Sequence, residues 1–163
     1  MPPPGGVGGR QAFERGHIDV AILQPTYLTE WYTDGFNTTE RNAQLVAEAP
    51  DRFLLNTRRD PREGDEGMRA FEDKVARYGC SDLNFIVDHV GLPRLEDFCF
   101  IAVQEPNVDA GLSVVTGGLM HARPNYFAKV MGELLFFVGE DRMLFGSDYA
   151  IWEPQWQVER FVE

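Results

Sequence analysis

The chain has 163 residues, which is enough for one ordinary domain and too few for two of average size. Asp and Glu number 26 against 15 Lys and Arg, and the formal net charge of −11 argues against a nucleic-acid binder or a polybasic membrane-surface protein. Hydrophobic residues make up 44% of the chain, which is ample for a packed core. No apolar run approaches the roughly 18 residues of a membrane-spanning helix.

The N-terminal segment differs in composition from the rest of the chain. Residues 1–9 are almost all Pro and Gly, so we expect a linker there and one folded domain over residues 10–163. The N-terminus has neither the charged start nor the apolar stretch of a signal peptide. Cys80 and Cys99 form no CxxC pair, and we expect both to be buried, reduced thiols. These features predict a cytoplasmic protein.

Five short runs of mostly apolar residues, several of them β-branched, have the composition of strands. They span residues 18–23, 53–57, 83–87, 112–115 and 143–145. Near-continuous apolar runs of this length are typical of strands that are buried on both faces, as in a parallel sheet. We therefore expect all five runs to lie in one mostly parallel sheet.

Helical patterns separate these runs. Asn37 or Thr38 is in place to cap the first helix, and Pro50 closes it. Gly79 lies where the second helix would end, and Pro124 suits the first turn of the last one. The apolar residues at helical spacing are Ala43, Val46 and Ala47; Met68, Phe71, Val75 and Tyr78; Leu95, Phe98, Cys99 and Ala102; and Phe127, Met131, Leu134, Leu135 and Val138. The alternation of strand and helix predicts an α/β fold with the helices outside the sheet.

Two polar residues follow predicted strands at the positions where parallel α/β folds collect reactive groups. His89 comes after the third strand, and Asp148 comes after the last. A histidine and a carboxylate at such positions can bind a divalent metal or act as an acid–base pair. An Asp after a strand also often caps the next helix, and a His in such a turn often bonds only to the backbone. The residues alone leave these alternatives open.

Other polar and aromatic residues have weaker signals. Arg58 and Arg59 end the second predicted strand, where one of them could hold a substrate carboxylate or form a salt bridge. Residues 117–121 (Gly-Gly-Leu-Met-His) read as a glycine-rich turn with an exposed His121. The aromatic residues expected in loops, where they would wall a pocket or an interface, are Trp31, Tyr32, Trp152 and Trp156.

Two of these segments resemble motifs of a known superfamily. Residues 144–149 (Leu-Phe-Gly-Ser-Asp-Tyr) resemble the eighth-strand segment of the metal-dependent amidohydrolases, and residues 88–93 (Asp-His-Val-Gly-Leu-Pro) resemble their sixth-strand His-x-Gly-x-Pro motif. Residues 16–23 resemble the second strand of the branch that includes aminocarboxymuconate-semialdehyde and dihydroxybenzoate decarboxylases. The chain is most similar to the amidohydrolases encoded beside bacterial propane-type monooxygenases, through nearly all of residues 10–163.

The resemblance implies a (β/α)₈ TIM-type barrel with a divalent metal, typically zinc, at its C-terminal mouth. Asp148 matches the carboxylate that touches the metal and exchanges a proton with its bound water, and His89 matches the histidine that polarises the water or the substrate. The segments that match the family's first, fourth and fifth strands are missing, and the sequence has no His-x-His. Because a complete barrel takes about 250 residues, we expect an incomplete barrel. Catalytic zinc normally has about three protein ligands, so we expect a partial ligand set as well.

Two functions of different classes follow from the resemblance. The first is metal-dependent hydrolysis or non-oxidative decarboxylation of a small organic acid, with His89 and Asp148 as catalytic residues and Asp148 as a metal ligand. The second is a non-catalytic barrel remnant that serves as an assembly partner in a monooxygenase system. Unpaired strand edges in an incomplete barrel predict a homo-oligomer or a complex with another subunit.

Overall fold

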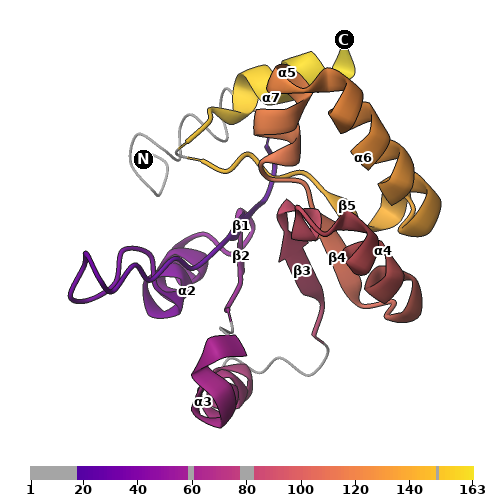
Figure 1. The fold of residues 1–163 in the computed structure, drawn as a ribbon. Helices are drawn as coiled ribbons and strands as arrows, with labels where there is room; N and C mark the ends of the chain where they lie inside the picture. The colour runs from indigo at the N-terminus through magenta and orange to yellow at the C-terminus, as the bar shows by residue number, and fades with distance from the viewer. Residues whose placement is uncertain (1–17, 59–60, 78–82, 150) are drawn as a thin grey trace. The chain divides into compact units, whose positions relative to one another are not determined.

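The computed structural model describes residues 18–58, 61–77, 83–149 and 151–163 (Figure 1). The chain divides into two compact units, which are residues 1–81 (unit 1) and residues 82–163 (unit 2). The predictions made for the linker over 1–9 and for four single residues lie outside the described residues; these four are Arg59, Tyr78, Gly79 and Cys80.

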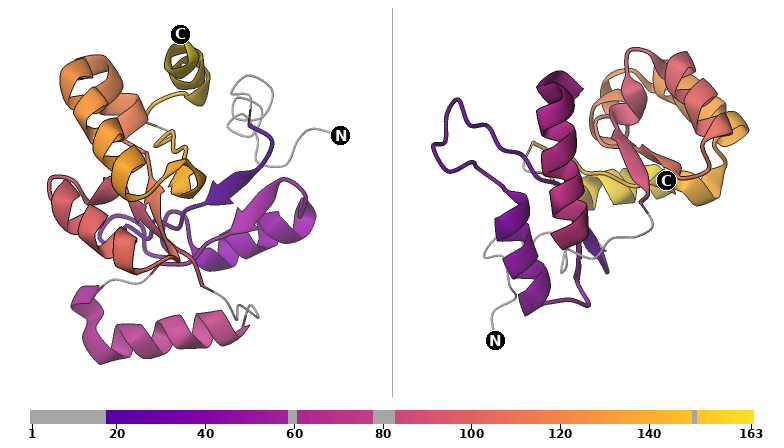
Figure 2. Two further views of the ribbon diagram at one scale, coloured as in Figure 1. Left: turned by 90° about the vertical axis from the view of Figure 1, so that its right-hand side faces the viewer. Right: turned by 90° about the horizontal axis from the view of Figure 1, so that it is seen from below.

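Unit 1 contains a pair of parallel strands and a helix that connects them. β1 (Ala21–Leu23) pairs with β2 (Phe53–Leu55), and Ala21 lies opposite Phe53. α2 (Thr39–Glu48) runs from one strand to the other and packs beside β2, as Figure 2 shows. This is the strand–helix–strand unit that the alternating pattern predicts.

Local sequence features account for where the helices of unit 1 begin. The Thr38 side chain accepts a hydrogen bond from the Arg41 backbone N–H at 3.3 Å, so Thr38 and not Asn37 caps α2. A short 3₁₀ turn, η2 (Pro61–Glu63), leads into α3 (Gly64–Arg77). The first turn of α3 is acidic and its last turn is basic, which complements the helix dipole.

Unit 2 contains a three-stranded parallel sheet in the order β3–β4–β5. Its strands are β3 (Phe85–Asp88), β4 (Val108–Gly111) and β5 (Met143–Leu144). α4 (Leu95–Gln104) connects the first pair and α6 (Pro124–Phe137) connects the second; these two helices lie side by side (Figure 2). The chain therefore alternates strand and helix through the sheet, as predicted.

Shorter elements complete unit 2 around this frame. They are the 3₁₀ turn η3 (His89–Gly91), the π-helical turn η4 (Val115–Leu119), α5 (Met120–Ala122), the 3₁₀ turn η5 (Glu140–Arg142) and the C-terminal helix α7 (Pro154–Val162). Arg142, in η5, links parts of the frame itself, because its guanidinium donates hydrogen bonds to four backbone carbonyls. These carbonyls belong to Val138, Ala102, Glu105 and Val108. One side chain thus connects the end of α4 to the start of β4.

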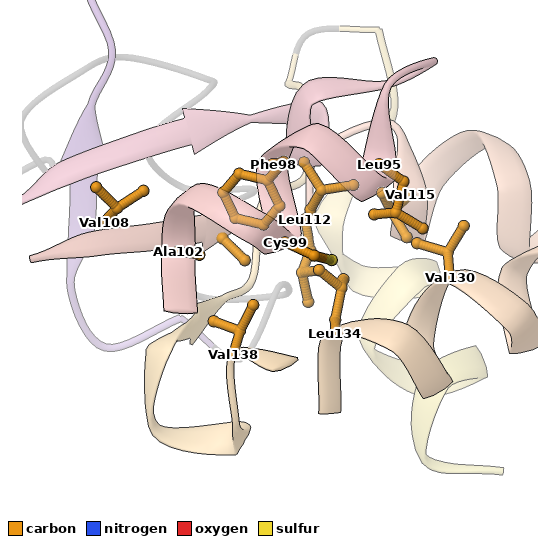
Figure 3. Packing of buried hydrophobic residues seen from close by; sticks show 12 residues of the cluster. Leu95, Phe98, Cys99, Ala102, Val108, Leu112, Val115, Val130, Leu134 and Val138 are labelled. Atoms are coloured by element: carbon orange, nitrogen blue, oxygen red, sulfur yellow. The ribbon is translucent and has the colours of Figure 1, made fainter. Parts of the chain in front are cut away.

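The hydrophobic core of unit 2 lies between the sheet and its two long helices (Figure 3). Every predicted apolar position of α4 is buried there, and Val130, Leu134 and Val138 form the buried stripe on and just after α6. The pKa of the Cys99 thiol is raised by burial and, in addition, by the charges of Glu133 and Glu96. Cys99 is therefore a buried thiol, as the sequence predicts.

Three predictions about secondary structure are wrong. The described strands, which close no barrel (an incomplete one is predicted), hydrogen-bond in two sheets and not in one. The fourth strand is β4 and ends at Gly111, whereas the predicted run at 112–115 leads from the strand into η4. Trp156 lies on α7 and not in a loop. Within the described residues, no helix is both long enough and apolar enough to cross a membrane.

Candidate functional site

The three strands of unit 2 end at one edge of their sheet. Asp88, the last residue of β3, lies opposite Gly111, the last residue of β4, and Gly111 lies opposite Leu144 at the end of β5. Because all three strands are parallel, the segments that follow them leave from this same edge. His89 follows β3 directly, and Asp148 follows β5 after three residues. The topology therefore starts both predicted residues from the carboxyl edge of one sheet.

A tight turn at the end of β3 separates a polar side chain from an apolar one. His89 and Val90 both have left-handed backbone angles, with φ of 59° and 48°. Such angles are unfavourable for a β-branched residue and cost about 1–3 kcal/mol. The Val90 side chain is fully buried in the core, while His89 is exposed. Burial of Val90 thus holds the turn in a conformation that leaves the imidazole outside the core.

The segment after β5 is held by a buried polar network. The Thr116 hydroxyl, in η4, has three acceptors that share its one proton. They are the backbone carbonyl of Gly146 at 2.9 Å, the backbone carbonyl of Leu112 at 3.1 Å and the Gln157 side-chain oxygen at 3.2 Å. The Gln157 amide, in α7, donates to the carbonyl of Ser147 at 2.9 Å. Thr116 and Gln157 are 1% and 0% exposed. Two buried side chains therefore bond to the two carbonyls that immediately precede Asp148.

Asp148 itself has a left-handed backbone angle, with φ of 54°. Its carbonyl accepts a hydrogen bond from the Ile151 N–H at 2.9 Å, and the Ser147 hydroxyl accepts one from the Tyr149 N–H at 3.3 Å. These bonds close a turn at Asp148. Along the chain, this turn follows the two carbonyls to which Thr116 and Gln157 bond. The half-buried carboxylate is thus carried by a segment whose backbone is bonded on both sides.

The ionisable groups at this edge interact electrostatically. Asp88 is exposed as a residue, but partial burial of its carboxyl is the largest influence on that group and raises its pKa. The positive charge of His89 lowers that pKa, and the negative charge of Asp148 raises it further, so the net result is a raised value. The structure therefore places both predicted residues, His89 and Asp148, within electrostatic range of Asp88.

The side chains at this edge do not amount to a metal site by themselves. Within the described residues, no group of three or more His, Cys, Asp or Glu side chains is placed to hold a metal ion. Catalytic zinc normally requires about three protein ligands. The described residues thus do not fit a complete zinc site, although a histidine and two carboxylates at one sheet edge have the chemistry of acid–base groups.

The remaining candidates lie elsewhere in the two units. His121 is exposed on α5, and its ring contacts Trp156 edge-on at 6.3 Å between centroids. Gly117 is buried under Trp152, since a Cβ atom there would lie 2.7 Å from the indole ring. In unit 1, the Arg58 guanidinium lies 5.5 Å from the centre of the Tyr27 ring.

Three residues of this site are not among the site residues that the sequence predicts. Asp88 carried a readable signal, because it is a carboxylate that ends an otherwise apolar strand next to His89. Thr116 and Gln157 carried none, since they are 41 residues apart and only the packing of η4 against α7 brings them together.

Comparison with known proteins places unit 2 in a family. The sequence model of the family described as Amidohydrolase matches residues 79–163, which is just over half of the chain and includes all of unit 2. No curated protein and no solved structure matches the chain. The matched residues include Asp88, His89 and Asp148, together with the network that holds the last of these. The chain therefore belongs to the amidohydrolase family.

Proposed function

We propose that the chain acts in the hydrolysis or non-oxidative decarboxylation of a small organic acid, with Asp148 and His89 as its acid–base residues. The single observation that carries this proposal is the carboxyl edge of the β3–β4–β5 sheet, from which both residues start and at which the charge of Asp148 acts on Asp88. Family membership supports a hydrolase. The two motifs at 88–93 and 144–149 support the narrower assignment to the decarboxylase-containing branch and to a (β/α)₈ barrel.

The roles of the residues follow from their chemistry. In hydrolysis, the Asp148 carboxylate takes a proton from water as the water oxygen attacks the substrate carbonyl. His89 donates a hydrogen bond to the carbonyl oxygen, where negative charge develops. The proton held by Asp148 then passes to the leaving group as its bond to carbon breaks. Asp88, with its raised pKa, is a second carboxyl that can hold a proton at this edge.

A divalent metal is part of the proposal, with Asp148 as one of its ligands. Such an ion, when bound, lowers the pKa of a coordinated water toward neutrality. Within the described residues, no three His, Cys, Asp or Glu side chains come together to hold such an ion, so the roles given above to His89 and Asp148 are those of the chain's own groups.

Turnover measurements on the purified chain test the proposal. With zinc in excess, we expect slow hydrolysis of small carboxylate-bearing esters, lactones or amides, followed as proton release at constant pH. Decarboxylation would be followed as CO₂ release from small unsaturated or aromatic acids. Asp148→Ala should reduce turnover to background, and His89→Ala should lower it by about 10²–10⁴-fold.

Two matched variants control for general damage to the protein. His121→Ala removes another exposed histidine, and Asp141→Asn changes an exposed carboxylate in η5. Both should keep the turnover of the parent chain. Equal turnover by the parent chain and Asp148→Ala would contradict the proposal, as would the absence of turnover on both substrate classes.

A further inference from the structure

Unit 1 contains a tyrosine whose phenol oxygen is surrounded by donors. The Lys74 ammonium donates a hydrogen bond to the Tyr27 oxygen at 2.8 Å. The Thr39 hydroxyl lies 3.1 Å from the same oxygen, and the Thr39 backbone N–H donates to it at 3.5 Å. Two side chains and one backbone amide therefore converge on a single oxygen atom.

Three different elements supply and support these groups. Tyr27 follows β1, Lys74 is on α3, and Thr39 is the first residue of α2. Thr39 is fully buried, and its hydroxyl lies 3.3 Å from the hydroxyl of Thr57, which follows β2. Because Thr57 can donate to Thr39, the Thr39 proton is available for the Tyr27 oxygen. The donors are thus positioned by the fold of unit 1 and not by a flexible surface contact.

The charges around the Tyr27 ring also favour the phenolate. The Lys74 nitrogen lies 4.9 Å from the ring centre and the Arg58 guanidinium carbon 5.5 Å from it. Burial is the largest single influence on the phenol and opposes its ionisation, but the hydrogen bonds from Lys74 and Thr39 and the charge of Lys74 together outweigh it. The net result is a lowered pKa for Tyr27. The side chain remains half-buried, so small molecules in solution can reach it.

We propose that Tyr27 is a nucleophilic phenol, an acyl-acceptor site in unit 1 that takes an acyl group from small activated acyl donors. All residues of this site belong to unit 1, and the proposal does not depend on the function proposed for the residues of unit 2. The phenol first loses its proton to solvent, while Lys74 stays protonated. The phenolate oxygen then forms a bond to the acyl carbon, and the bond from that carbon to the leaving group breaks. The product is an aryl ester, and the leaving group departs with the electron pair.

Acetylation by N-acetylimidazole tests this proposal on the full chain. The reagent transfers its acetyl group to the phenol and releases imidazole, and peptide mapping by mass spectrometry measures the rate at each tyrosine. Hydroxylamine removes acetyl groups from tyrosine but not from lysine, which separates the two products. Each unit by which a phenol pKa falls gives about tenfold more phenolate at neutral pH. We therefore expect Tyr27 to react several-fold faster than Tyr126.

Tyr126 is a matched internal control. It is half-buried like Tyr27, and the Arg123 guanidinium lies 4.7 Å from its ring centre. Within the described residues, however, its hydroxyl makes no hydrogen bond to a lysine. Lys74→Met should slow acetylation of Tyr27 to the rate of Tyr126, and Lys74→Arg should restore part of the difference. Arg123→Met should leave the rate at Tyr27 unchanged.

Two outcomes would overturn the proposal. One is acetylation of Tyr27 in the parent chain at no more than the rate of Tyr126. The other is an unchanged rate at Tyr27 in a folded Lys74→Met variant. If Lys74→Met loses its helical circular dichroism, the parent chain is tested alone. The rate at Tyr27 must then level off at a lower pH than the acetylation rate of free N-acetyltyrosine amide in the same buffers.

Discussion

Left-handed backbone angles at non-glycine residues mark the ends of the strands in unit 2. Among the described residues, five non-glycine residues have positive φ, and four of them follow strands of this one sheet. They are His89 and Val90 after β3, Val114 after β4, and Asp148 after β5. Each such residue costs about 1–3 kcal/mol and persists only where its surroundings hold it. The concentration of strain at one edge supports a functional role for that edge.

At the scale of one residue, the raised pKa of the Asp88 carboxyl predicts how the stability of the chain depends on pH. Its pKa is raised in the folded chain above the usual aspartate value of about 3.9. The folded state therefore holds the proton to higher pH than the unfolded state, and stability falls as pH rises through this window. Asp88→Asn stays neutral and avoids that loss. We expect its Tm to match the parent near pH 3 and to exceed it at neutral pH.

Thermal unfolding by circular dichroism between pH 3 and pH 8 measures this difference. A gap in Tm between Asp88→Asn and the parent that opens with rising pH supports the raised pKa. A difference in Tm that is constant with pH, or that grows as the pH falls, would mean that the folded state does not disfavour the ionised carboxyl.

At the scale of elements, α7 and η4 hold the segment that carries Asp148. Thr116→Val keeps the shape of the side chain but removes the hydroxyl that bonds to Gly146 and Gln157. A buried group left without its partner costs about 1–3 kcal/mol. We expect that loss in the free energy of unfolding, together with faster hydrogen exchange over residues 146–149. Thr116→Ser keeps the hydroxyl, so its exchange over the same residues should stay near that of the parent.

Urea unfolding and hydrogen exchange read by mass spectrometry make these two measurements. Gln157→Leu should act in the same direction, because it removes the donor to the Ser147 carbonyl. Exchange over residues 146–149 that is the same in Thr116→Val and the parent would show that the network does not hold this segment.

The segments that follow β5 and β4 approach each other closely, and this contact leads to a second prediction at the scale of elements. A Cβ atom on Gly146 would lie 2.7 Å from the Ser113 nitrogen and 2.9 Å from its Cβ. Backbone atoms cannot give way as a flexible side chain can, so Gly146→Ala should destabilise unit 2 by about 1–3 kcal/mol. Gly132 lies on α6 with nothing within 4 Å of an added Cβ. Gly132→Ala should therefore stabilise the helix by about 0.5–1 kcal/mol.

Paired denaturant unfolding curves of the two glycine variants check this prediction. The opposite signs make the comparison a control for the substitution itself. If Gly146→Ala is as stable as the parent, the strands have room to separate at this edge, and the close contact does not position Asp148.

At the scale of the whole molecule, metal affinity is the property most sensitive to the incomplete ligand set. Asp148 and His89 provide one carboxylate and one imidazole, while a catalytic zinc site draws on about three protein ligands. Complete structural zinc sites bind with about 10–16 kcal/mol, and water replaces a missing protein ligand poorly. We expect the 163-residue chain to bind zinc weakly and to lose it on dialysis without chelator.

Elemental analysis after dialysis measures the retained zinc, and a titration with added zinc measures the weak affinity. Asp148→Ala should weaken that affinity further. One equivalent of zinc kept by the parent chain and lost from Asp148→Ala would mean that further ligands exist, and His121 would be the first to test.

The sequence by itself determined the local elements of this protein. A cap at Asn37 or Thr38 and the Pro50 boundary predicted α2, and apolar residues at helical spacing predicted α4 and α6. The short apolar runs predicted β1 and β3. Caps and periodicity act within a few residues, so the sequence alone shows them. His89 and Asp148 were identified as candidates because each follows such a strand and lies in a recognisable motif.

Tertiary structure decided the features that depend on distant partners. β4 contains an aspartate, an alanine and a glycine, which are weak strand formers, and it is a strand because β3 and β5 pair with it on both sides. Gly111 suits this position because a Cβ there would lie 3.0 Å from the Asp88 carboxylate. The bonds from Thr116 to Gln157 and from Lys74 to Tyr27 join residues 41 and 47 positions apart. No local pattern encodes such contacts, because they form only when separate elements pack together.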